Sequence, residues 1–463
     1  MLNKGLFLIA FICLHSFYSW SQQDSVTVHA FVISGNQKTK PQIITREITL
    51  IKGQRYASKE ISEQIKQSEL NLINTRLFNF ATITPVPLDS SKIALRVVVE
   101  ERWYVWPSPI FELAETNFNT WWLTKDFSRT NYGAFVNWKN FRGRNDQLYI
   151  KLRFGYSQEF RLSYEFPYIN KKQNFGLGVS FDYFQQKEIT YGTAENKRLF
   201  ISDGDLNMRQ EYQYKAQAFY RKNIFTQHLL EVRHTRTIVN DTVPELNRNY
   251  LLNSSTEAKY MSLIYRIKID RRDVKAYPLK GYLIEGLFQK VGFGLFDNRF
   301  KELSYFQLAY KKYEHIKNRW FAGISLKQKI SLYANEPYYT QRGLGYSDFV
   351  RGYEYYVIDA QQYSLIKSNI KFQLIKPRVK EFKFIKIKQF KKVPYAIYAN
   401  AYADIAYAYD ELYSEANQLA NKWLIGVGVG IDFVTYYDKV VRLELSHNHL
   451  NEIGFFIHFK QPL

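Results

Sequence analysis

The segment QLYIKLRF, residues 147–154, carries the pattern that decides the fold. Apolar side chains alternate along it with polar or amphipathic ones: Leu148, Ile150, Leu152 and Phe154 against Gln147, Tyr149, Lys151 and Arg153. Successive side chains of a β-strand point to opposite faces, so this strand has one apolar face and one wet face. Residues 261–270 and 425–433 repeat the alternation. A period of two residues that recurs to the end of the chain is the signal of transmembrane barrel strands.

From Trp103 onward, we count 16 such segments, separated by charged or Asn/Gly-containing turns. They start near Ile110, Asn131, Gln147, Phe160, Asn174, Gln210, Thr226, Met261, Gly281, Leu303, Trp320, Tyr363, Ala396, Lys422, Val440 and Gly454. A closed single-chain barrel requires an even number of strands. The sequence therefore predicts an all-β membrane protein, with a 16-stranded transmembrane antiparallel β-barrel over residues 103–463. A secreted soluble β-sandwich also alternates, but the length and aromatic content of the segments favour the membrane.

Composition supports the barrel and excludes other classes. Tyr and Phe number 37 and 35, against 3 Met and 12 Pro, and aromatic residues suit pleated surfaces and membrane interfaces. After residue 21, no stretch approaches the roughly 18 apolar residues of a membrane helix. The formal charge of +21 comes without a nucleic-acid-binding signature. A basic surface beside anionic envelope lipids or acidic polypeptides is the simpler interpretation, and we expect no nucleic-acid partner.

The N-terminus has the pattern of a signal peptide. Lys4 precedes an apolar run from Leu6 to Leu14, and Ser19-Trp20-Ser21 suits cleavage before Gln22. We therefore expect residues 1–21 to be removed and the protein to reach the cell outer membrane. The only cysteine, Cys13, lies in this segment, so the mature chain has no disulfide, thiolate nucleophile or cysteine metal site.

Residues 24–101 predict a separate small α+β domain. The pattern is strand, helix, helix, strand, strand, over 26–34, 41–47, 58–72, 76–84 and 92–100. We expect this domain in the periplasm. Barrel strand parity then makes the link between strands 11 and 12 extracellular and the link between strands 8 and 9 periplasmic.

The sequence contains no recognisable catalytic motif. The chain has no G-x-S-x-G or H-E-x-x-H motif, and His447 and His449 have no carboxylate at ligand spacing. We therefore predict no catalytic residues, metal site or cofactor, and a protein that is not an enzyme.

The predicted loop after strand 11 holds a specific motif. Val350, Arg351, Gly352 and Tyr353 resemble the VRG(F/Y) tip of the BamA/TamA family of outer-membrane assembly proteins. The resemblance implies that the sixth extracellular loop folds back into the lumen. Asp404, in Tyr402-x-Asp-x-Ala406, resembles the aromatic-x-Asp-x-Gly motif whose carboxylate pairs with the loop arginine; Ala406 departs from the usual glycine.

Two further features extend the resemblance over nearly the whole mature chain. One resembles the family's D-x-R-D-x-x-x-(F/Y)-P-x-x-G signature around a periplasmic turn, where we expect a tight turn and a charge network rather than substrate contact: Asp270, Arg272, Asp273, Pro278 and Gly281. The N-terminal unit is similar to a single POTRA domain, through Gly35-Asn36, Ile44, Arg46-Glu47, Gly53, Arg76-Leu77-Phe78 and Glu100.

The physical case for the loop site is the cost of burying a charge. A guanidinium inside a barrel needs a carboxylate partner, and alternation turns Asp404 inward. A bidentate pair with Arg351 pins the loop to the wall. Gly426, Gly428 and Gly430 remove inward side chains from the next strand and predict a trough for the loop. A kinked strand is the alternative interpretation.

The ends of the barrel sequence suggest a weak seam. Pro107 and Pro109 enter the first strand and cannot donate ladder hydrogen bonds, and Gly454 lies in the last. An exposed edge there can template an incoming strand, although an ordinary closed seam is the alternative. The chain end also fits the C-terminal signal of barrels that are themselves inserted, through Glu452, Gly454, Ile457 and Phe459, but it continues to Leu463.

Residues 376–392 hold eight basic residues and one acid, interleaved with aromatic residues. This predicted periplasmic hairpin can dock an acidic partner or lie at lipid headgroups, and a solvated hairpin is an equal alternative.

The resemblance implies that the protein assists insertion of outer-membrane polypeptides through the POTRA-like domain and the seam between strands 1 and 16. The alternatives are a dedicated secretion pore of the two-partner type and a passive channel or surface antigen. The expected partners are unfolded outer-membrane or secreted polypeptides, outer-membrane lipid and periplasmic or lipoprotein accessory proteins. A single POTRA-like domain indicates an accessory or specialised member.

Overall fold

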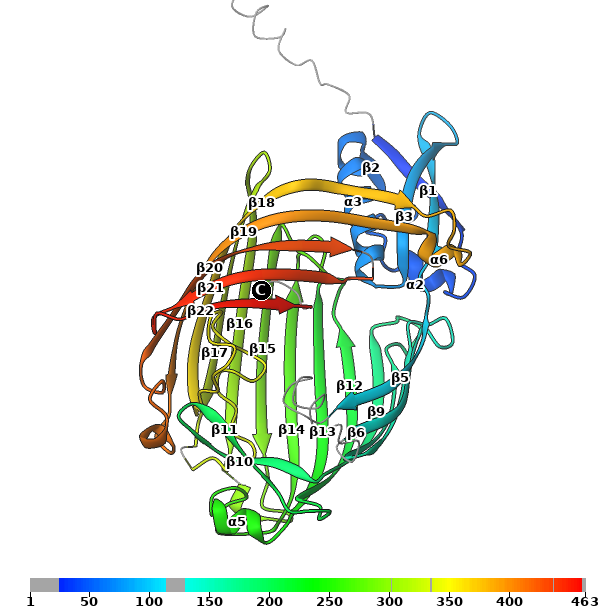
Figure 1. Ribbon diagram of the computed structural model, residues 1–463. Helices are drawn as coiled ribbons and strands as arrows, with labels where there is room; N and C mark the ends of the chain where they lie inside the picture. Colours follow the sequence, from blue (N-terminus) through cyan, green and yellow to red (C-terminus); the bar gives the residue numbers. More distant parts are fainter. Residues whose placement is uncertain (1–24, 114–129, 301, 334, 436, 460–463) are drawn as a thin grey trace, which may run out of the picture.

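The protein consists of a small mixed domain and one large curved sheet (Figure 1). The computed structural model describes residues 25–113, 130–300, 302–333, 335–435 and 437–459. The predicted signal peptide, residues 1–21, lies outside these ranges. Within them, no helix is long and apolar enough to cross a membrane.

The small domain is a four-stranded sheet covered by a long helix. Its elements are β1 (Ser25–Ser34), α2 (Pro41–Thr45), β2 (Arg55–Ala57), α3 (Ser58–Asn74), β3 (Phe78–Pro87) and β4 (Lys92–Glu101). The sheet order is β2-β1-β4-β3, with β1 parallel to β4. Ile61, Ile65 and Leu72 form one apolar stripe of α3, which is buried in the core with Leu95 and Val97 of β4. The structure adds the short strand β2 to the predicted elements and ends α2 two residues before the predicted 47.

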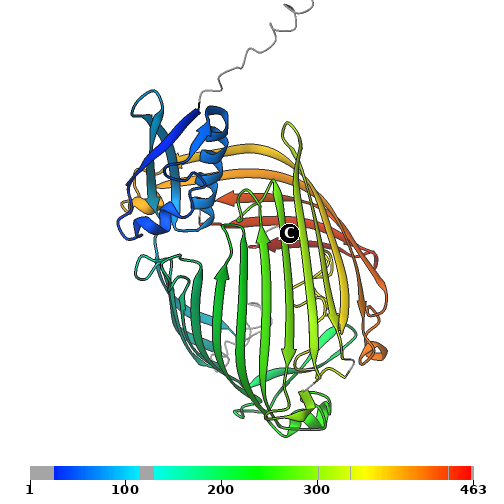
Figure 2. The ribbon, with the colours of Figure 1, turned by 180° about the vertical axis from the view of Figure 1, so that it is seen from behind.

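The large sheet has sixteen strands, as predicted, and every strand pairs antiparallel with its sheet neighbours in chain order (Figure 2). The strands are β5 (Val105–Leu113), β6 (Thr130–Lys139), β7 (Gln147–Gly155), β8 (Ser157–Phe166), β9 (Phe175–Gln186), β12 (Arg209–Arg221), β13 (Thr226–Val239), β14 (Glu257–Asp270), β15 (Gly281–Val291), β16 (Ser304–Lys317), β17 (Trp320–Ser331), β18 (Gln362–Glu381), β19 (Lys392–Tyr409), β20 (Trp423–Thr435), β21 (Val440–Asn448) and β22 (Ile453–His458).

The connections at the end far from the small domain carry extra structure. The link between β9 and β12 forms a separate hairpin of β10 (Glu188–Ala194) and β11 (Lys197–Ser202), which the sequence pattern did not reveal. Helix α5 (Thr242–Leu246) and two 3-10 turns, η1 (Asn298–Phe300) and η2 (Ser414–Ala416), lie in other links. Strands β10 and β11 are only seven and six residues long, which is too short for an alternating pattern to be recognised in the sequence.

The two faces of the sheet differ as the alternation requires. On β20, the outward side chains Ile425, Val427 and Val429 are exposed, whereas Leu424 and Asp432 on the inward face are buried. On β21, Leu443 and Leu445 are likewise exposed between buried inward residues. An apolar outer surface around a polar interior suits a barrel surrounded by hydrocarbon.

The sheet has two free edges. Among the described residues, β5 pairs only with β6, and β22 pairs only with β21. β5 begins at Val105, earlier than the predicted start near Ile110, so Pro107 and Pro109 lie within the strand rather than before it. Since no ladder joins β5 to β22 in the described chain, the seam of the barrel is unpaired.

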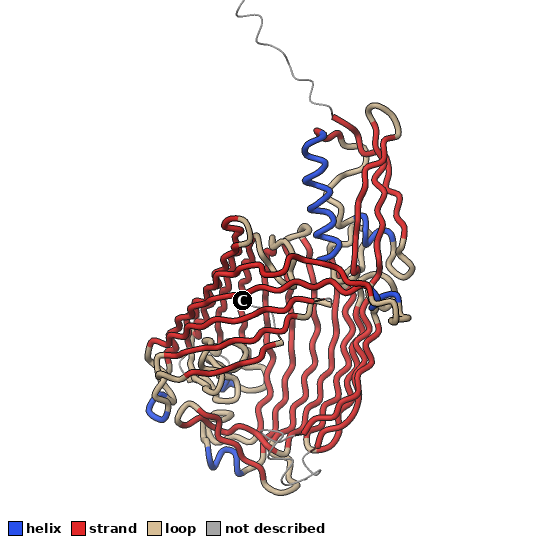
Figure 3. Tube along the Cα trace, turned by 45° about the horizontal axis from the view of Figure 1, so that its top comes forward, coloured by secondary structure: helices blue, strands red, loops and turns tan. Residues whose placement is uncertain are grey.

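The small domain lies at one end of the barrel (Figure 3), beside the ends of β18 and β19, which are labelled in Figure 1. Glu47, which follows α2, accepts two hydrogen bonds from Arg221 at the end of β12, at 2.6 and 2.7 Å. Burial raises the pKa of Glu47, but the hydrogen bonds and charge of Arg221 outweigh it and hold the pKa below its usual value. Arg46 lies over the ring of Tyr168, in the turn between β8 and β9.

Other contacts fix the domain to neighbouring turns. Asn74, at the end of α3, donates to the carbonyl oxygen of Asp273 at 2.6 Å and accepts from the amide of Lys275 at 2.9 Å. Arg102, between β4 and β5, donates to both carboxylate oxygens of Asp438, in the turn between β20 and β21, at 2.9 and 3.2 Å. The domain therefore contacts strand ends on both sides of the seam.

Candidate functional site: a loop tip inside the barrel

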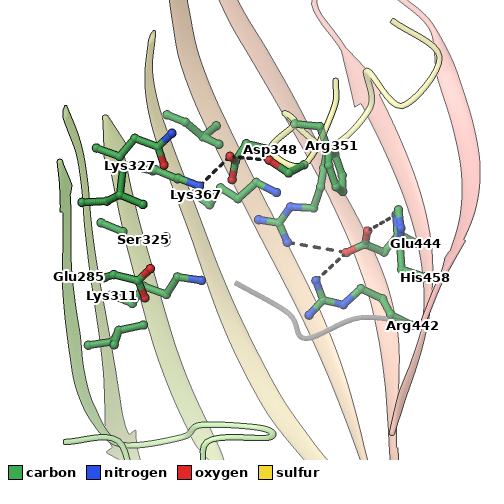
Figure 4. Close-up of a pocket in the computed structure, with 17 residues that line it drawn as sticks. Glu285, Lys311, Ser325, Lys327, Asp348, Arg351, Lys367, Arg442, Glu444 and His458 are labelled. Atoms are coloured by element: carbon green, nitrogen blue, oxygen red, sulfur yellow. Dashed lines mark hydrogen bonds and ion pairs between the residues drawn. The ribbon is translucent and has the colours of Figure 1, made fainter. Parts of the chain in front are cut away.

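The connection between β17 and β18 folds back against the inner wall of the barrel. Val350 and Tyr353 are each 1% exposed and belong to a buried cluster with Leu365 of β18, Ala406 of β19 and Leu424 of β20. The tip between them, Arg351-Gly352, thus lies among polar groups of the wall (Figure 4). The cluster supplies the apolar contacts that hold the tip in place.

Arg351 is paired with Asp404 in a bidentate arrangement. Its Nε donates to Oδ2 at 2.8 Å and its second terminal nitrogen to Oδ1 at 2.5 Å, while its backbone amide donates to Oδ2 at 3.1 Å. Both residues are buried, and the guanidinium stacks 3.8 Å from the ring centroid of Tyr402. The structure thus brings together the two residues that the motif resemblance pairs.

The rest of the tip is held by the last strands. Gly352 has φ +92°, a conformation that favours glycine, and its carbonyl accepts from Asn448 at 2.8 Å. The hydroxyl of Tyr353 donates to the carbonyl of Ile425 at 3.2 Å and contacts Nδ1 of His449. His449 therefore belongs to the loop's binding surface.

The glycine track of β20 clears space for the loop at one position only. A Cβ on Gly426 would lie 1.9 Å from the carbonyl oxygen of Arg351, so the loop backbone occupies that space. Over Gly428 the hydroxyl of Tyr402 fills the space, and over Gly430 the side chains of Asn400 and Glu444 do. The predicted trough is thus confined to Gly426, which lies directly opposite Asp404 in the ladder.

Ala406 does not hold the loop away from the wall. Its side chain is 1% exposed and packs in the same cluster as Val350. The methyl group that replaces the motif's glycine is thus absorbed into the apolar anchor of the loop tip.

A second buried ion pair continues from the first. Glu444 of β21 lies 3.7 Å from Arg351 and 3.1 Å from Arg442, which donates to Asp432 at 2.6 and 3.1 Å. Tyr277 donates to Asp432 at 2.6 Å. An unbroken chain of charged and polar side chains therefore runs from the loop tip to the turn between β14 and β15.

Sequence reasoning missed Arg442, Glu444 and Asp432 as members of this network. The signal was present, because alternation places Asp432 on the same face as the glycines of β20. Arg442 lies opposite Asp432 in the ladder. A search for opposite charges on facing inward positions would have found the pair.

The motif of the β14–β15 turn has a local structural role. Arg272 donates to both oxygens of Asp270 at 2.8 and 2.9 Å, and Asp273 accepts from the amide of Leu279 at 3.0 Å. Gly281 has φ +93°, and a Cβ there would lie 2.1 Å from a backbone oxygen. Pro278 is buried beside Tyr277. The turn also carries the Asp273 contact to the small domain, which the motif alone did not indicate.

A cavity of about 340 Å³ lies beside the loop tip, lined by residues of β15 to β18 and of the last strands. Asp348, which precedes the loop tip in the sequence, forms an ion pair with Lys327 of β17 at 2.6 Å, and both residues line the cavity. The cavity lining includes Arg351, Glu444 and His458 (Figure 4).

The remaining sequence candidates lie at the rims. Ile457 and Phe459 of the C-terminal signal are exposed, Gly454 faces inward, and Glu452 accepts from Tyr356 at 2.6 Å. Residues 376–392 form the end of β18, helix α6 (Lys388–Lys391) and the start of β19. There Lys392 pairs with Glu100 at 2.6 Å and the carbonyl of Gln389 accepts from Asn79, so this basic hairpin contacts the small domain.

Comparisons with known proteins agree with this architecture. The family model POTRA, described as surface antigen variable number repeat, matches residues 26–102. A search of curated proteins found no match. Among solved structures, BamA from Haemophilus ducreyi lacking POTRA domains 1–3 is 13% identical, with a TM-score of 0.51, over 93% of this chain and 83% of that one. CdiB from Escherichia coli is 10% identical, with a TM-score of 0.53, over 94% and 75%.

The fold defines a class: a POTRA domain followed by a 16-stranded antiparallel β-barrel whose loop tip lies against the inner face. The family model identifies residues 26–102 as a POTRA domain, and the solved structures show that the fold of the whole chain is similar to that of BamA and CdiB.

Proposed function

We propose that the protein assists the insertion of polypeptides into the outer membrane at the seam between β5 and β22. In this proposal, the POTRA domain lies in the periplasm and receives the unfolded chain, and the β17–β18 loop enters the lumen from the cell exterior. The fold fits insertion and secretion alike, so the choice between them depends on the seam and the lumen.

The observation that carries the proposal is the pair of free sheet edges. β5 and β22 each have a ladder on one side only within the described chain. An unpaired strand edge presents backbone donors and acceptors that an incoming strand can satisfy by β-augmentation. The POTRA domain leads directly into β5, so a polypeptide bound to it arrives beside one of these edges.

The lumen argues against a secretion pore as the first choice. The loop tip lies against β18 to β21, and its arginine donates three hydrogen bonds to Asp404. A polypeptide that passes through the lumen needs this loop displaced, whereas insertion at the seam leaves it in place.

The experiment is site-specific photo-cross-linking in growing cells, with a photoreactive residue at Ser108 of β5. The matched control is Gln217 of β12, which like Ser108 lies on the inward face of the sheet but far from both sheet edges, where it donates to Glu231. Insertion predicts adducts between Ser108 and several newly made barrel proteins, and none from Gln217. Adducts with one secreted protein, formed from the lumen-lining Gln307 and not from Ser108, would instead establish export and overturn the proposal. Cross-links from neither position would also contradict it.

A further inference from the structure

Three buried ligand atoms without hydrogen-bond partners converge beside the loop tip. They are Oε1 of Glu354 in the loop, Oε2 of Glu444 on β21 and Nε2 of His458 on β22. Within the described residues, none of these atoms makes a hydrogen bond, and Nε2 lies at ion-pair distance from both oxygens. Because a buried polar atom without a partner costs free energy, three such atoms in one place call for a common partner.

The spacing of the atoms is that of metal ligands. Nε2 of His458 lies 3.3 Å from the Glu444 oxygen and 3.4 Å from the Glu354 oxygen, and all three atoms lie within 4.8 Å of one another. Zn²⁺ binds imidazole nitrogen and carboxylate oxygen at about 2.0–2.2 Å, which separates tetrahedral ligands by about 3.3–3.5 Å. The two distances from His458 to the carboxylate oxygens match this ligand–ligand separation.

In Glu354 and Glu444, one carboxylate oxygen accepts a hydrogen bond from another group. These hydrogen bonds orient the remaining oxygen of each carboxylate toward His458. Oε2 of Glu354 accepts from the amide of Gly352 at 2.8 Å. Oε1 of Glu444 accepts from Arg442 at 3.1 Å. Glu444 is 1% exposed, and its second oxygen faces His458 (Figure 4).

The neighbouring Arg351 and Arg442 each pair mainly with another carboxylate, so they compensate the negative charge of Glu354 and Glu444 only in part. Arg351 has its own bidentate partner in Asp404, and Arg442 has one in Asp432. The cavity of about 340 Å³ is lined by both Glu444 and His458, so a hydrated ion can reach them. The ring of His458 is stacked on Phe349, at 5.6 Å between centroids, which fixes its orientation.

We propose that Glu354, Glu444 and His458 bind a divalent first-row transition metal ion, with water in the remaining positions. A set of one imidazole and two carboxylates suits Zn²⁺ and its neighbours better than Ca²⁺ or Mg²⁺, which take oxygen ligands. The ion ties β22, the edge strand at the seam, to the loop that occupies the lumen. This site is independent of the proposed insertion function.

The test is Zn²⁺ binding to the full mature chain, purified in detergent and stripped with a chelator. We expect one saturable site by calorimetry and, with Co²⁺ as a substitute, the visible absorption of a low-symmetry N/O site. His458→Gln and Glu354→Gln should each weaken Zn²⁺ binding by about a hundredfold or more. His447→Gln is the matched control, because His447 is on the adjacent strand and faces outward.

Two further measurements keep the result decisive. The electrophoretic shift of the folded barrel on heating reports whether each variant is folded. Hydrogen exchange of β22 should slow on addition of Zn²⁺ in the wild type and in His447→Gln, but not in His458→Gln or Glu354→Gln. If folded protein takes up no Zn²⁺, then a proton on His458 that pairs with both carboxylates is the occupant, and the proposal is wrong. Binding that survives in both ligand variants, or that is lost in His447→Gln, overturns it as well.

Discussion

The wall formed by β18 to β21 and the seam between β5 and β22 belong to one sheet but are stabilised very differently. β18 and β19 are 20 and 18 residues long and pair with each other over most of that length. β5 and β22 have nine and six residues, and each has one partner strand. The wall also holds the buried pairs of Arg351 and Arg442, whereas the seam has no ladder in the described chain. Stability in a barrel is therefore local, and the weakest line runs beside the strongest.

This arrangement gives the two seam edges different supports. β22 pairs with β21, which carries Arg442 and Glu444 of the buried network. β5 is steadied at its start by Arg102 and its two hydrogen bonds to Asp438. The β22 edge thus depends on the wall. The β5 edge depends on the hydrogen bonds between Arg102 and Asp438, which we call the clamp, next to the POTRA domain.

The largest effect is expected from Arg351→Ala, which tests the wall. It leaves Asp404 buried without its main partner, and breaking a buried ion pair in this way costs about 3–5 kcal/mol. We expect the loop to leave the wall, with a lower barrel unfolding temperature and new protease cleavage within residues 335–360.

Two variants calibrate that result. Arg351→Lys keeps the charge but loses the planar two-point contact, so its unfolding temperature should lie between wild type and Arg351→Ala. Arg342→Ala, in the same loop, removes an exposed arginine that donates only to backbone carbonyls and should change little. A loop that stays protected in Arg351→Ala would show that the apolar cluster alone anchors it.

The next effect is expected from Asp438→Asn, which tests the clamp on the seam side. Asp438 accepts from Arg102 and pairs with Arg76 at 3.2 Å, and hydrogen bonds to charged groups contribute about 1.5–3 kcal/mol. Its φ of +62° is one that asparagine tolerates, so the backbone should stay as it is. We expect faster hydrogen exchange in β5 with unchanged exchange in β18 and β19. Equal loss of protection in both would contradict the division between wall and seam.

A smaller effect on the wall is expected from Gly426→Ala. The added Cβ meets the Arg351 carbonyl oxygen at 1.9 Å, so loop or strand must shift, and overpacking of this kind costs about 1–3 kcal/mol. Gly192→Ala, where the Cβ meets only Leu199 at 3.8 Å, is the matched control. Differential scanning calorimetry of both variants measures the difference. Equal unfolding temperatures would mean that the loop yields without cost.

The sequence could predict the wall better than the seam, for a physical reason. Alternation needs only local side-chain order, so it located all sixteen strands and turned Asp404 inward, and the motif resemblance then supplied its partner. Whether Gly428 and Gly430 face a loop or a tyrosine depends on which side chains cross from neighbouring strands, which no single strand encodes. The convergence of Glu354, Glu444 and His458 was hidden for the same reason, because they lie on three separate segments.

The position of the POTRA domain shows the same limit. Its fold follows from local patterns, but the pairing of Glu47 with Arg221 joins residues far apart in the sequence. Glu47 lies in the stretch that resembles a POTRA domain, but nothing in that stretch identifies Arg221 as its partner. Buried polar contacts between domains are thus the features that sequence patterns leave open.

The smallest change in stability is expected from Pro107→Ala combined with Pro109→Ala, and it tests the seam most directly. Pro107 and Pro109 are two residues apart in β5, so their backbone nitrogens point to the same side of the strand. In an edge strand, proline is tolerated where that nitrogen points to the unpaired side, because it cannot donate a hydrogen bond. Restoring two amide donors should alter the unfolding free energy by only about 1 kcal/mol, since each new hydrogen bond to β22 replaces one to solvent and contributes little net free energy. Yet the restored donors let β5 pair with β22, so cross-linking of cysteines at Phe111 and Ile457 should increase, and photo-adducts from Ser108 should fall. A variant with a closed seam and undiminished adducts would mean that polypeptides do not enter there.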